Sequence, residues 1–320
     1  MVTQDRQTLV IAVLGLGEAG SVIARDLAAA GVRVRGYDPA VTASGPVLDT
    51  ASEADAARGA DLVLSVNSAK AAVDALRAGL PGLRREGPDQ EGPCREGPCR
   101  EGADQESPDQ ESLRPGGPRR HVLWADLNTA SPGTKRQLAD IAEKAGVAFA
   151  DVAMMAPVPG RGLRVPMLAS GTGAARYAAL LGPLGAGIEV LDGPAGLAAS
   201  KKLLRSVFYK GMAASIVEAL DAAQAAGDEQ WLRDHITAEL AAMDAATMER
   251  ITGGTRKHAV RRAAEMEAAA DMLTELGVPP LMAAASRAVH ERLTGSGCPA
   301  AADRQRLTGS GSPAAAHRPR

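Results

Sequence analysis

Aromatic residues, cysteines and net charge are all scarce in this chain of 320 residues. Aromatics make up only 2% of it, so a hydrophobic core must be built from aliphatic side chains and methionine. Three cysteines, two of which (Cys94 and Cys99) lie in a low-complexity segment, supply neither a disulfide framework nor a metal site. A formal net charge of −2 gives no electrostatic reason to expect nucleic acid or an anionic membrane as a partner.

Long apolar runs are missing as well. No run approaches the ~20 residues of a membrane-spanning helix. The segment Met1–Gln7 lacks the apolar core of a signal peptide. We therefore expect a cytoplasmic protein without a membrane partner, long enough for two domains.

The most informative segment present is Val10–Gly20, where apolar residues typical of a buried strand lead into Gly-x-Gly-x-x-Gly. The motif lies between an expected strand, Leu9–Leu14, and an expected helix, Ala19–Ala30. In a dinucleotide-binding fold its glycines allow a tight turn, a close approach to the pyrophosphate and close helix packing. The helix N-terminus also attracts phosphate. We expect the cofactor to contact Gly15, Leu16, Gly17, Glu18, Ala19 and Gly20; a glycine-rich turn of another α/β domain is the alternative.

An acidic residue follows the next expected strand, Arg33–Tyr37. Asp38 lies 18 residues after Gly20, where a carboxylate can bind the adenosine ribose. It would repel a 2′-phosphate, and the segment 39–42 contains no Arg or Lys, so NAD is favoured over NADP. NADP stays open, because another part of the fold could supply a base. Asn67, after the strand Asp61–Val66, is expected to face the nicotinamide, since ligands bind at the carboxyl ends of parallel strands.

Strand and helix patterns alternate through the first half and give way to helices in the second. A short helix is expected to start at Ser52-Glu53, and longer helices are expected at Ser68–Leu80 and Pro132–Ala145. Strands are expected at His121–Ala125 and Val147–Ala150. This alternation predicts a parallel sheet covered on both faces. After Gly193 we expect a long helix through Leu220, then helices at Glu229–Ile251, Thr255–Leu276 and Leu281–Leu293.

The predicted fold is therefore α/β: an N-terminal Rossmann dinucleotide-binding domain (1–192) and an all-α C-terminal domain (193–294), joined by a long interdomain helix. A segment rich in Gly, Pro and charge (84–120) is predicted to be a disordered insertion, and the repetitive tail (295–320) to be disordered.

Three further segments carry a family resemblance, together with the glycine motif. They are Asp126–Gly133, Phe149–Gly160, and Gly193–Gly196 followed by Ala198–Leu204. They resemble the β-hydroxyacid dehydrogenase family, which includes 3-hydroxyisobutyrate and 6-phosphogluconate dehydrogenases and is related to imine reductases. Within it, the chain is similar to a bacterial subgroup with a phosphogluconate-dehydrogenase-like C-terminal domain.

The resemblance implies an NAD(P)-dependent dehydrogenase in which a lysine is the general acid/base. That lysine is Lys202 or, as the alternative, Lys201; adjacent helical residues point about 100° apart, so only one can face a cleft. Two solvated surface lysines are the plainer interpretation. An imine reductase is a second enzymatic possibility, which a lysine at this position disfavours. A non-catalytic cofactor-binding scaffold or sensor is the third.

The substrate-side residues implied by the family motifs are Asn128, Thr129, Ser131, Pro159, Gly160 and Arg161. Ser131 precedes Pro132 and could instead cap a helix. Arg161 and Arg205 depart from the family pattern and would suit an anionic substrate, such as a small β-hydroxy acid, by bidentate pairing. Arg164 could assist, or these could be solvated loop arginines.

Two expectations concern the helical half. His258, Arg261, Arg262 and Glu265 share one helix face, which is either solvated or borders a cleft. The Ala- and Leu-rich helices carry more apolar surface than one small domain can hide, and the family resemblance also implies a homodimer.

Overall fold

The computed structural model describes residues 9–83 and 122–295. The chain forms two compact units, and the division between them falls after Arg205, inside a long helix. The expected insertion with Cys94 and Cys99, and the tail from residue 296 onward, lie outside the described residues.

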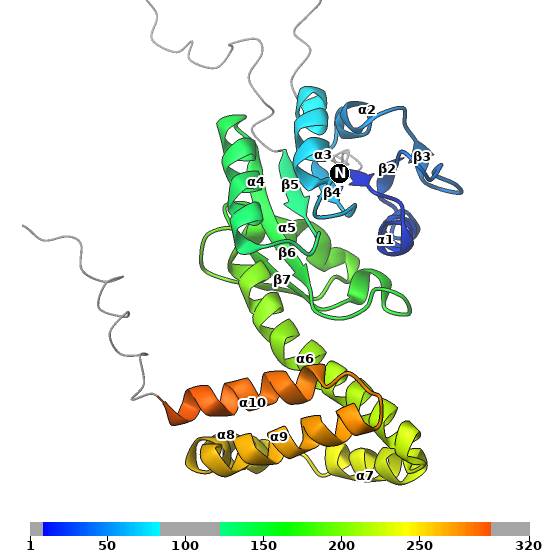
Figure 1. Ribbon diagram of the computed structural model, residues 1–320. Helices are drawn as coiled ribbons and strands as arrows, with labels where there is room; N and C mark the ends of the chain where they lie inside the picture. Colours follow the sequence, from blue (N-terminus) through cyan, green and yellow to red (C-terminus); the bar gives the residue numbers. More distant parts are fainter. Residues whose placement is uncertain (1–8, 84–121, 296–320) are drawn as a thin grey trace, which may run out of the picture. The chain divides into compact units, whose positions relative to one another are not determined.

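The first unit is built on an eight-stranded sheet with the strand order β3-β2-β1-β4-β5-β6-β7-β8 (Figure 1). The chain reverses its direction of strand addition at β1, which lies between β2 and β4, as in doubly wound folds. The predicted α/β fold class is thus confirmed. The strands are β1 Val10–Leu14, β2 Arg33–Tyr37, β3 Leu48–Asp49, β4 Leu62–Ser65, β5 Leu123–Asp126, β6 Ala148–Met154, β7 Met167–Ser170 and β8 Ile188–Val190.

Helices cover both faces of this sheet, as expected. Alternate residues of β1 point to opposite faces: Ile11 and Val13 join the core under α1 and α5, while Ala12 and Leu14 join the core under α2, α3 and α4. The helices are α1 Glu18–Ala29, α2 Glu53–Ala57, α3 Ala72–Gly79, α4 Pro132–Lys144 and α5 Ala174–Leu181, with 3-10 turns η1 Leu80–Leu83, η2 Gly162–Arg164 and η3 Gly182–Leu184.

The strands expected from the sequence pair parallel to one another, but β7, which was not predicted, runs antiparallel to β6. The connecting segment 155–166 holds only the short turn η2, without the crossover helix that a parallel strand usually needs. Instead, the chain folds straight back, and Met155 N donates to Pro166 O at 2.8 Å. Strand β8 then pairs parallel to β7.

The second unit is helical. Helix α6 (Leu197–Ala226) leads into it, and α7 Glu229–Ala241, α8 Ala245–Lys257, α9 Ala259–Glu275 and α10 Leu281–Thr294 follow. Helix α10 folds back along α9 after a turn at Gly277, whose φ is +75° (Figure 1). No helix in the described ranges is both long enough and apolar enough to cross a membrane.

The expected helix Glu229–Ile251 is wrong, because α7 ends at Ala241 and a new helix begins after Asp244. The Asp244 carboxylate accepts the Thr247 N–H at 2.8 Å, and Thr247 Oγ1 accepts the Asp244 N–H at 3.3 Å. This capping box satisfies N–H groups that would otherwise lack partners at the start of α8. The expected helix Thr255–Leu276 likewise begins only at Ala259, since α8 continues through Lys257.

Candidate active site

The glycine motif lies at the carboxyl edge of the sheet, where β1 and β4 run side by side. Gly15 has a φ of +97°, and a Cβ there would lie 2.7 Å from backbone atoms of Val66 and Asn67. Gly20 is equally restricted, because its Cβ would collide with Gly15 O. Both glycines are therefore required by the close packing of the turn and of α1 against the end of β4.

Gly17 differs from its two neighbours in the motif. It is exposed, and an added Cβ would meet no atom within 4 Å. It is the N-cap residue of α1 and makes no side-chain capping bond. Glu18 and Ala19 open the helix beside it. The turn thus offers open space over exposed backbone at a helix N-terminus, which is the arrangement that binds a pyrophosphate.

Asp38 is fixed beside this turn, directly after β2. Its carboxylate accepts the Leu16 N–H at 2.8 Å, the Ala40 N–H at 2.8 Å and the Val41 N–H at 3.1 Å. The carboxylate therefore links the glycine turn to the end of β2. The backbone N–H of Leu16 already has a partner.

A polar cluster joins the ends of β4 and β5. Asn128 is buried, and its Nδ2 lies 3.0 Å from Ser65 Oγ, 2.7 Å from Asn67 Oδ1 and 2.7 Å from Asp126 Oδ2. Asn67 also packs by its backbone against Gly15. The amide group of Asn128 thus holds together two strand ends, rather than pointing freely into solvent.

Lys202 is brought to the loop that follows β5. Its Nζ donates a 2.8 Å hydrogen bond to Thr129 Oγ1. Lys202 is partly buried, whereas Lys201 is exposed, as adjacent positions on a helix predict. Lys202 and Thr129 line a small hollow together with Asn128, Ala130, Val152, Ala153, Ala199 and Leu203, whereas Lys201 does not.

The other residues expected to bind the substrate lie outside the hollow beside Lys202. Ser131 caps α4, accepting the Thr134 N–H at 3.1 Å. Pro159, Gly160 and Arg161 are exposed on the loop after β6, and this loop is tied to α1 by a 2.8 Å hydrogen bond from Leu163 N to Asp26 Oδ2. Arg205 is exposed on α6. None of these residues lines the hollow beside Lys202.

The four residues expected to share one helix face in the second unit (His258, Arg261, Arg262 and Glu265) are mainly exposed to solvent. Arg261 pairs with Glu265 at 2.8 Å, and both side chains are more than half exposed. Arg262 donates to Thr255 Oγ1 at 2.8 Å, and His258 stands between α8 and α9.

Three buried charged residues were not anticipated from the sequence: Asp126, Lys135 and Asp151. The Lys135 side chain is 1% exposed, and its Nζ lies 2.5 Å from Asp126 Oδ1 and 3.3 Å from Asp151 Oδ1. The available signal was the pair of aspartates in otherwise apolar strands. Nothing in the pattern of α4 marks Lys135 as buried. In the described ranges, no group of three or more His, Cys, Asp and Glu side chains could hold a metal ion.

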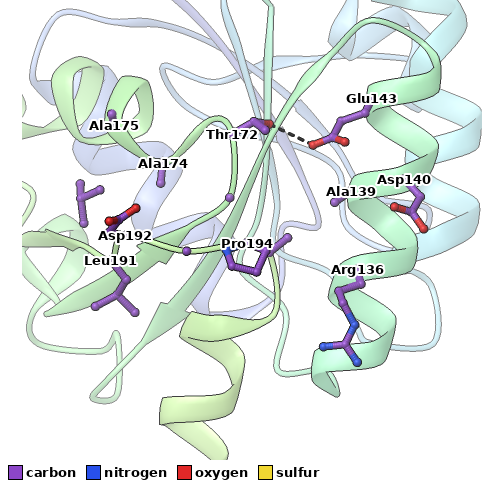
Figure 2. Close-up of a pocket in the computed structure, with 14 residues that line it drawn as sticks. Arg136, Ala139, Asp140, Glu143, Thr172, Ala174, Ala175, Leu191, Asp192 and Pro194 are labelled. Atoms are coloured by element: carbon purple, nitrogen blue, oxygen red, sulfur yellow. Dashed lines mark hydrogen bonds between the residues drawn. The ribbon is translucent and has the colours of Figure 1, made fainter. Parts of the chain in front are cut away.

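Two further hollows occur in the first unit. One, of about 210 Å³, lies between α1 and residues 41–47 and is lined by Ser21, Arg25 and Thr42 among others. The second, of about 770 Å³, lies along α4 and the turns after β7 and β8 (Figure 2). There Thr172 Oγ1 and Glu143 Oε1 are 3.2 Å apart. This second hollow contains none of the expected site residues.

Comparison with known proteins supports the fold. Residues 223–293 match the family model described as a domain of unknown function, DUF1932. A conserved hypothetical protein from Sinorhizobium meliloti 1021 is 26% identical, with a TM-score of 0.52 over 92% of each chain. A conserved protein reported to be structurally similar to 3-hydroxyacid dehydrogenases is 25% identical, with a TM-score of 0.50 over 95% of this chain and 100% of the other.

An enzyme structure also matches along most of its length. The imine reductase from Myxococcus stipitatus, in complex with NADP+, has a TM-score of 0.66 at 17% identity and covers 90% of this chain and 95% of its own. No curated protein sequence matches the chain. The chain therefore has the fold that the 3-hydroxyacid dehydrogenase-like protein and the imine reductase share.

Proposed function

We propose that the protein is an oxidoreductase that transfers a hydride between a nicotinamide dinucleotide and a small, anionic β-hydroxy acid or related alcohol, with Lys202 as the general acid/base. One observation carries the proposal. The glycine turn, Asn67 and Thr129 follow neighbouring parallel strands at one edge of the sheet, and Lys202 reaches Thr129 there.

The residues present fit a dinucleotide. Gly15 and Gly20 shape the turn, Gly17 leaves its backbone open, and the first turn of α1 has no side-chain cap. The pyrophosphate would lie over Gly17 and the N-terminus of α1, with the adenosine ribose toward Asp38. The bound nicotinamide would supply or accept the hydride.

Lys202 is suited to move the accompanying proton. Oxidation of an alcohol requires loss of the hydroxyl proton, and reduction of a carbonyl requires its return to the oxygen. The Lys202 amine can accept or donate that proton, while the Thr129 hydroxyl orients Nζ through their 2.8 Å hydrogen bond. Lys201 is the alternative, but it is exposed and does not line the hollow.

For the cofactor we favour NAD, with NADP as the alternative. Three backbone N–H groups hold the Asp38 carboxylate in place, and a fixed negative charge there repels a 2′-phosphate. Arg25, which lines the hollow beside residues 41–47, would oppose this preference. An anionic substrate is proposed because Arg161, on the loop after β6, and Arg205, three residues after Lys202 on α6, are exposed positive charges that could pair with a carboxylate.

The test is a binding and turnover experiment on the full chain. NADH and NADPH fluorescence titrations measure binding, and hydroxy acids, sugar acids and their phosphates are screened by the change in NADH absorbance. Lys202→Met should retain dinucleotide binding and lose turnover, while Lys201→Met, the matched control, should retain both. A protein that binds neither dinucleotide would refute the proposal.

An imine reductase is the second candidate, favoured by the likeness in fold to the Myxococcus stipitatus enzyme. Cyclic imines assayed with NADPH and NADH distinguish it from a hydroxy acid dehydrogenase. Dinucleotide binding without turnover of either class would instead indicate a scaffold or sensor.

We further propose that the protein is a homodimer. In the described part of the second unit, the buried apolar side chains are small with one exception: Ala222, Ala223, Ala259, Leu273 and Ala283. Large apolar residues, such as Val207 and Phe208 on α6, are 76% and 65% exposed. So small a core is marginal by itself, and a second copy would cover the exposed faces. Light scattering of the wild type and of Val207→Glu tests this; a monomeric wild type would contradict it.

A further inference from the structure

The buried lysine of α4 lies between two strands that carry aspartates in register. Asp126 at the end of β5 pairs with Asp151 in β6, so their side chains lie side by side. Lys135 Nζ contacts one oxygen of each carboxylate and also donates to Asp126 O at 2.7 Å. All three side chains are at most 1% exposed. One ammonium group therefore neutralises part of the charge of two carboxylates.

The other oxygen of Asp151 caps the helix that carries Lys202. Asp151 Oδ2 accepts the Gly196 N–H at 2.9 Å and the Ala199 N–H at 3.1 Å. Ser170 Oγ donates to the same oxygen at 3.2 Å and accepts the Ala198 N–H at 3.1 Å. These bonds satisfy N–H groups at the start of α6, and a carboxylate there is favoured by the helix dipole.

Both partners of the Lys202–Thr129 hydrogen bond are thus attached to one network. Thr129 lies three residues after Asp126, and Lys202 lies three residues after Ala199, close to one helical turn. Buried ion pairs contribute little net stability but hold a specific geometry, because any misplacement leaves a charge uncompensated.

We propose that Lys135 and Asp151 are positioning residues, which fix the start of α6 so that the Lys202 amine, and not that of Lys201, faces Thr129. The proposal rests on the proposed function of Lys202. Neither residue would touch the reacting atoms, because both act through the backbone of α6 and the end of β5.

The test is the chemical reactivity of individual lysines, which requires no substrate. Trace labelling of the folded full chain with acetic anhydride, followed by mass spectrometry, reports Lys202 and Lys201 separately. In the wild type, Lys202 should react more slowly than Lys201. In Asp151→Ala, labelling of Lys202 should rise roughly threefold to tenfold, the factor expected for loss of one ordinary hydrogen bond. Lys201 should be unchanged.

Two variants separate positioning from general loss of structure. Asp151→Asn keeps an oxygen that can accept the Gly196 and Ala199 N–H groups, so it should restore slow labelling of Lys202. Lys144→Met, at the exposed end of α4, is the control and should match the wild type. Unchanged Lys202 labelling in Asp151→Ala would overturn the proposal.

If Asp151→Ala does not fold, Ser170→Ala replaces it, since this change removes the acceptor of the Ala198 N–H and one donor to Asp151 Oδ2 but leaves all charges in place. Faster Lys202 labelling is again expected, and an unchanged rate would again overturn the proposal. NADH titration is run on the same samples. If the wild type fails to bind NADH, the proposed function fails, while the labelling result still decides whether the network positions Lys202.

Discussion

Replacing Gly17 by Ala should separate cofactor binding from folding, because the three glycines of the motif have different surroundings. Gly17 has a φ of −65° and a ψ of −162°, which an alanine can adopt, and its added Cβ meets nothing within 4 Å. A Gly→Ala change at a compatible position restricts the unfolded chain and stabilises a protein by about 0.4–1 kcal/mol. We therefore expect Gly17→Ala to be as stable as the wild type or slightly more so.

The same methyl group would occupy the space where the pyrophosphate approaches the backbone. We expect the Kd for NADH to rise at least about tenfold, equivalent to about 1.4 kcal/mol. Gly15→Ala is the contrasting variant: its φ of +97° costs about 1–2 kcal/mol for a residue with a Cβ. That Cβ would also lie 2.7 Å from the Val66 and Asn67 backbone, which adds to the loss.

Urea unfolding followed by circular dichroism measures the free energy of unfolding of each variant, and NADH fluorescence measures the Kd. Two results would refute the reasoning. If Gly17→Ala binds NADH as tightly as the wild type, the dinucleotide does not cross this turn. If Gly17→Ala is destabilised by more than about 1 kcal/mol, the open space over Gly17 is filled in solution.

Four further predictions concern stability and its pH dependence. A Cβ on Gly79 would lie 2.7 Å from the Trp124 ring, so Gly79→Ala should cost about 1–3 kcal/mol in urea unfolding, and a smaller Phe at position 124 should recover part of that loss. Burial raises the pKa of Tyr177 above its usual 10.0. The contribution of the neutral phenol to stability is therefore complete below pH 10.0 and declines above it. Alkaline absorbance titration should show one tyrosine that ionises only when the protein unfolds. Tyr177→Phe should change the free energy of unfolding by less than about 1.5 kcal/mol, because the phenol donates its hydrogen bond to Met167 Sδ, a weak acceptor. Hydrogen bonds from the Thr247 backbone and side chain lower the pKa of Asp244 below 3.8. The contribution of the Asp244 carboxylate to stability is therefore present above pH 3.8 and is lost as the pH falls through the lowered value. Asp244→Ala should lower the melting temperature at neutral pH and remove this acid-dependent loss, as measured by circular dichroism.

Local sequence signals predicted the parts of the fold that are decided locally. The strand, turn and helix around the glycine motif follow from residue type and spacing, and Ser131 before Pro132 correctly suggested a capped helix start. The break before α8 was readable in principle, since Asp244 and Thr247 have capping-box spacing, but continuous apolar periodicity concealed it.

The parts that depend on distant partners could not be predicted. Strand β7 is four residues long, and its antiparallel direction depends on how the segment 155–166 folds back. Lys135 looks like a solvated lysine on a polar helix. Its burial is decided by Asp126 and Asp151, which lie on two strands of the sheet. Sheet pairing and buried ion pairs are properties of the assembled fold, so a single segment carries little signal for them.

The choice between Lys201 and Lys202 shows the same limit at the proposed catalytic position. Periodicity establishes that adjacent lysines point about 100° apart, but it does not give the phase of α6 relative to the sheet. That phase is set where the helix begins, because Asp151, 48 residues earlier in the chain, accepts the Ala199 N–H. With that point fixed, the position three residues later turns toward Thr129 and its neighbour turns toward solvent. Which lysine faces Thr129 therefore depends on a tertiary cap, and a change at Asp151 should loosen the proposed acid/base, Lys202, without any change to either lysine.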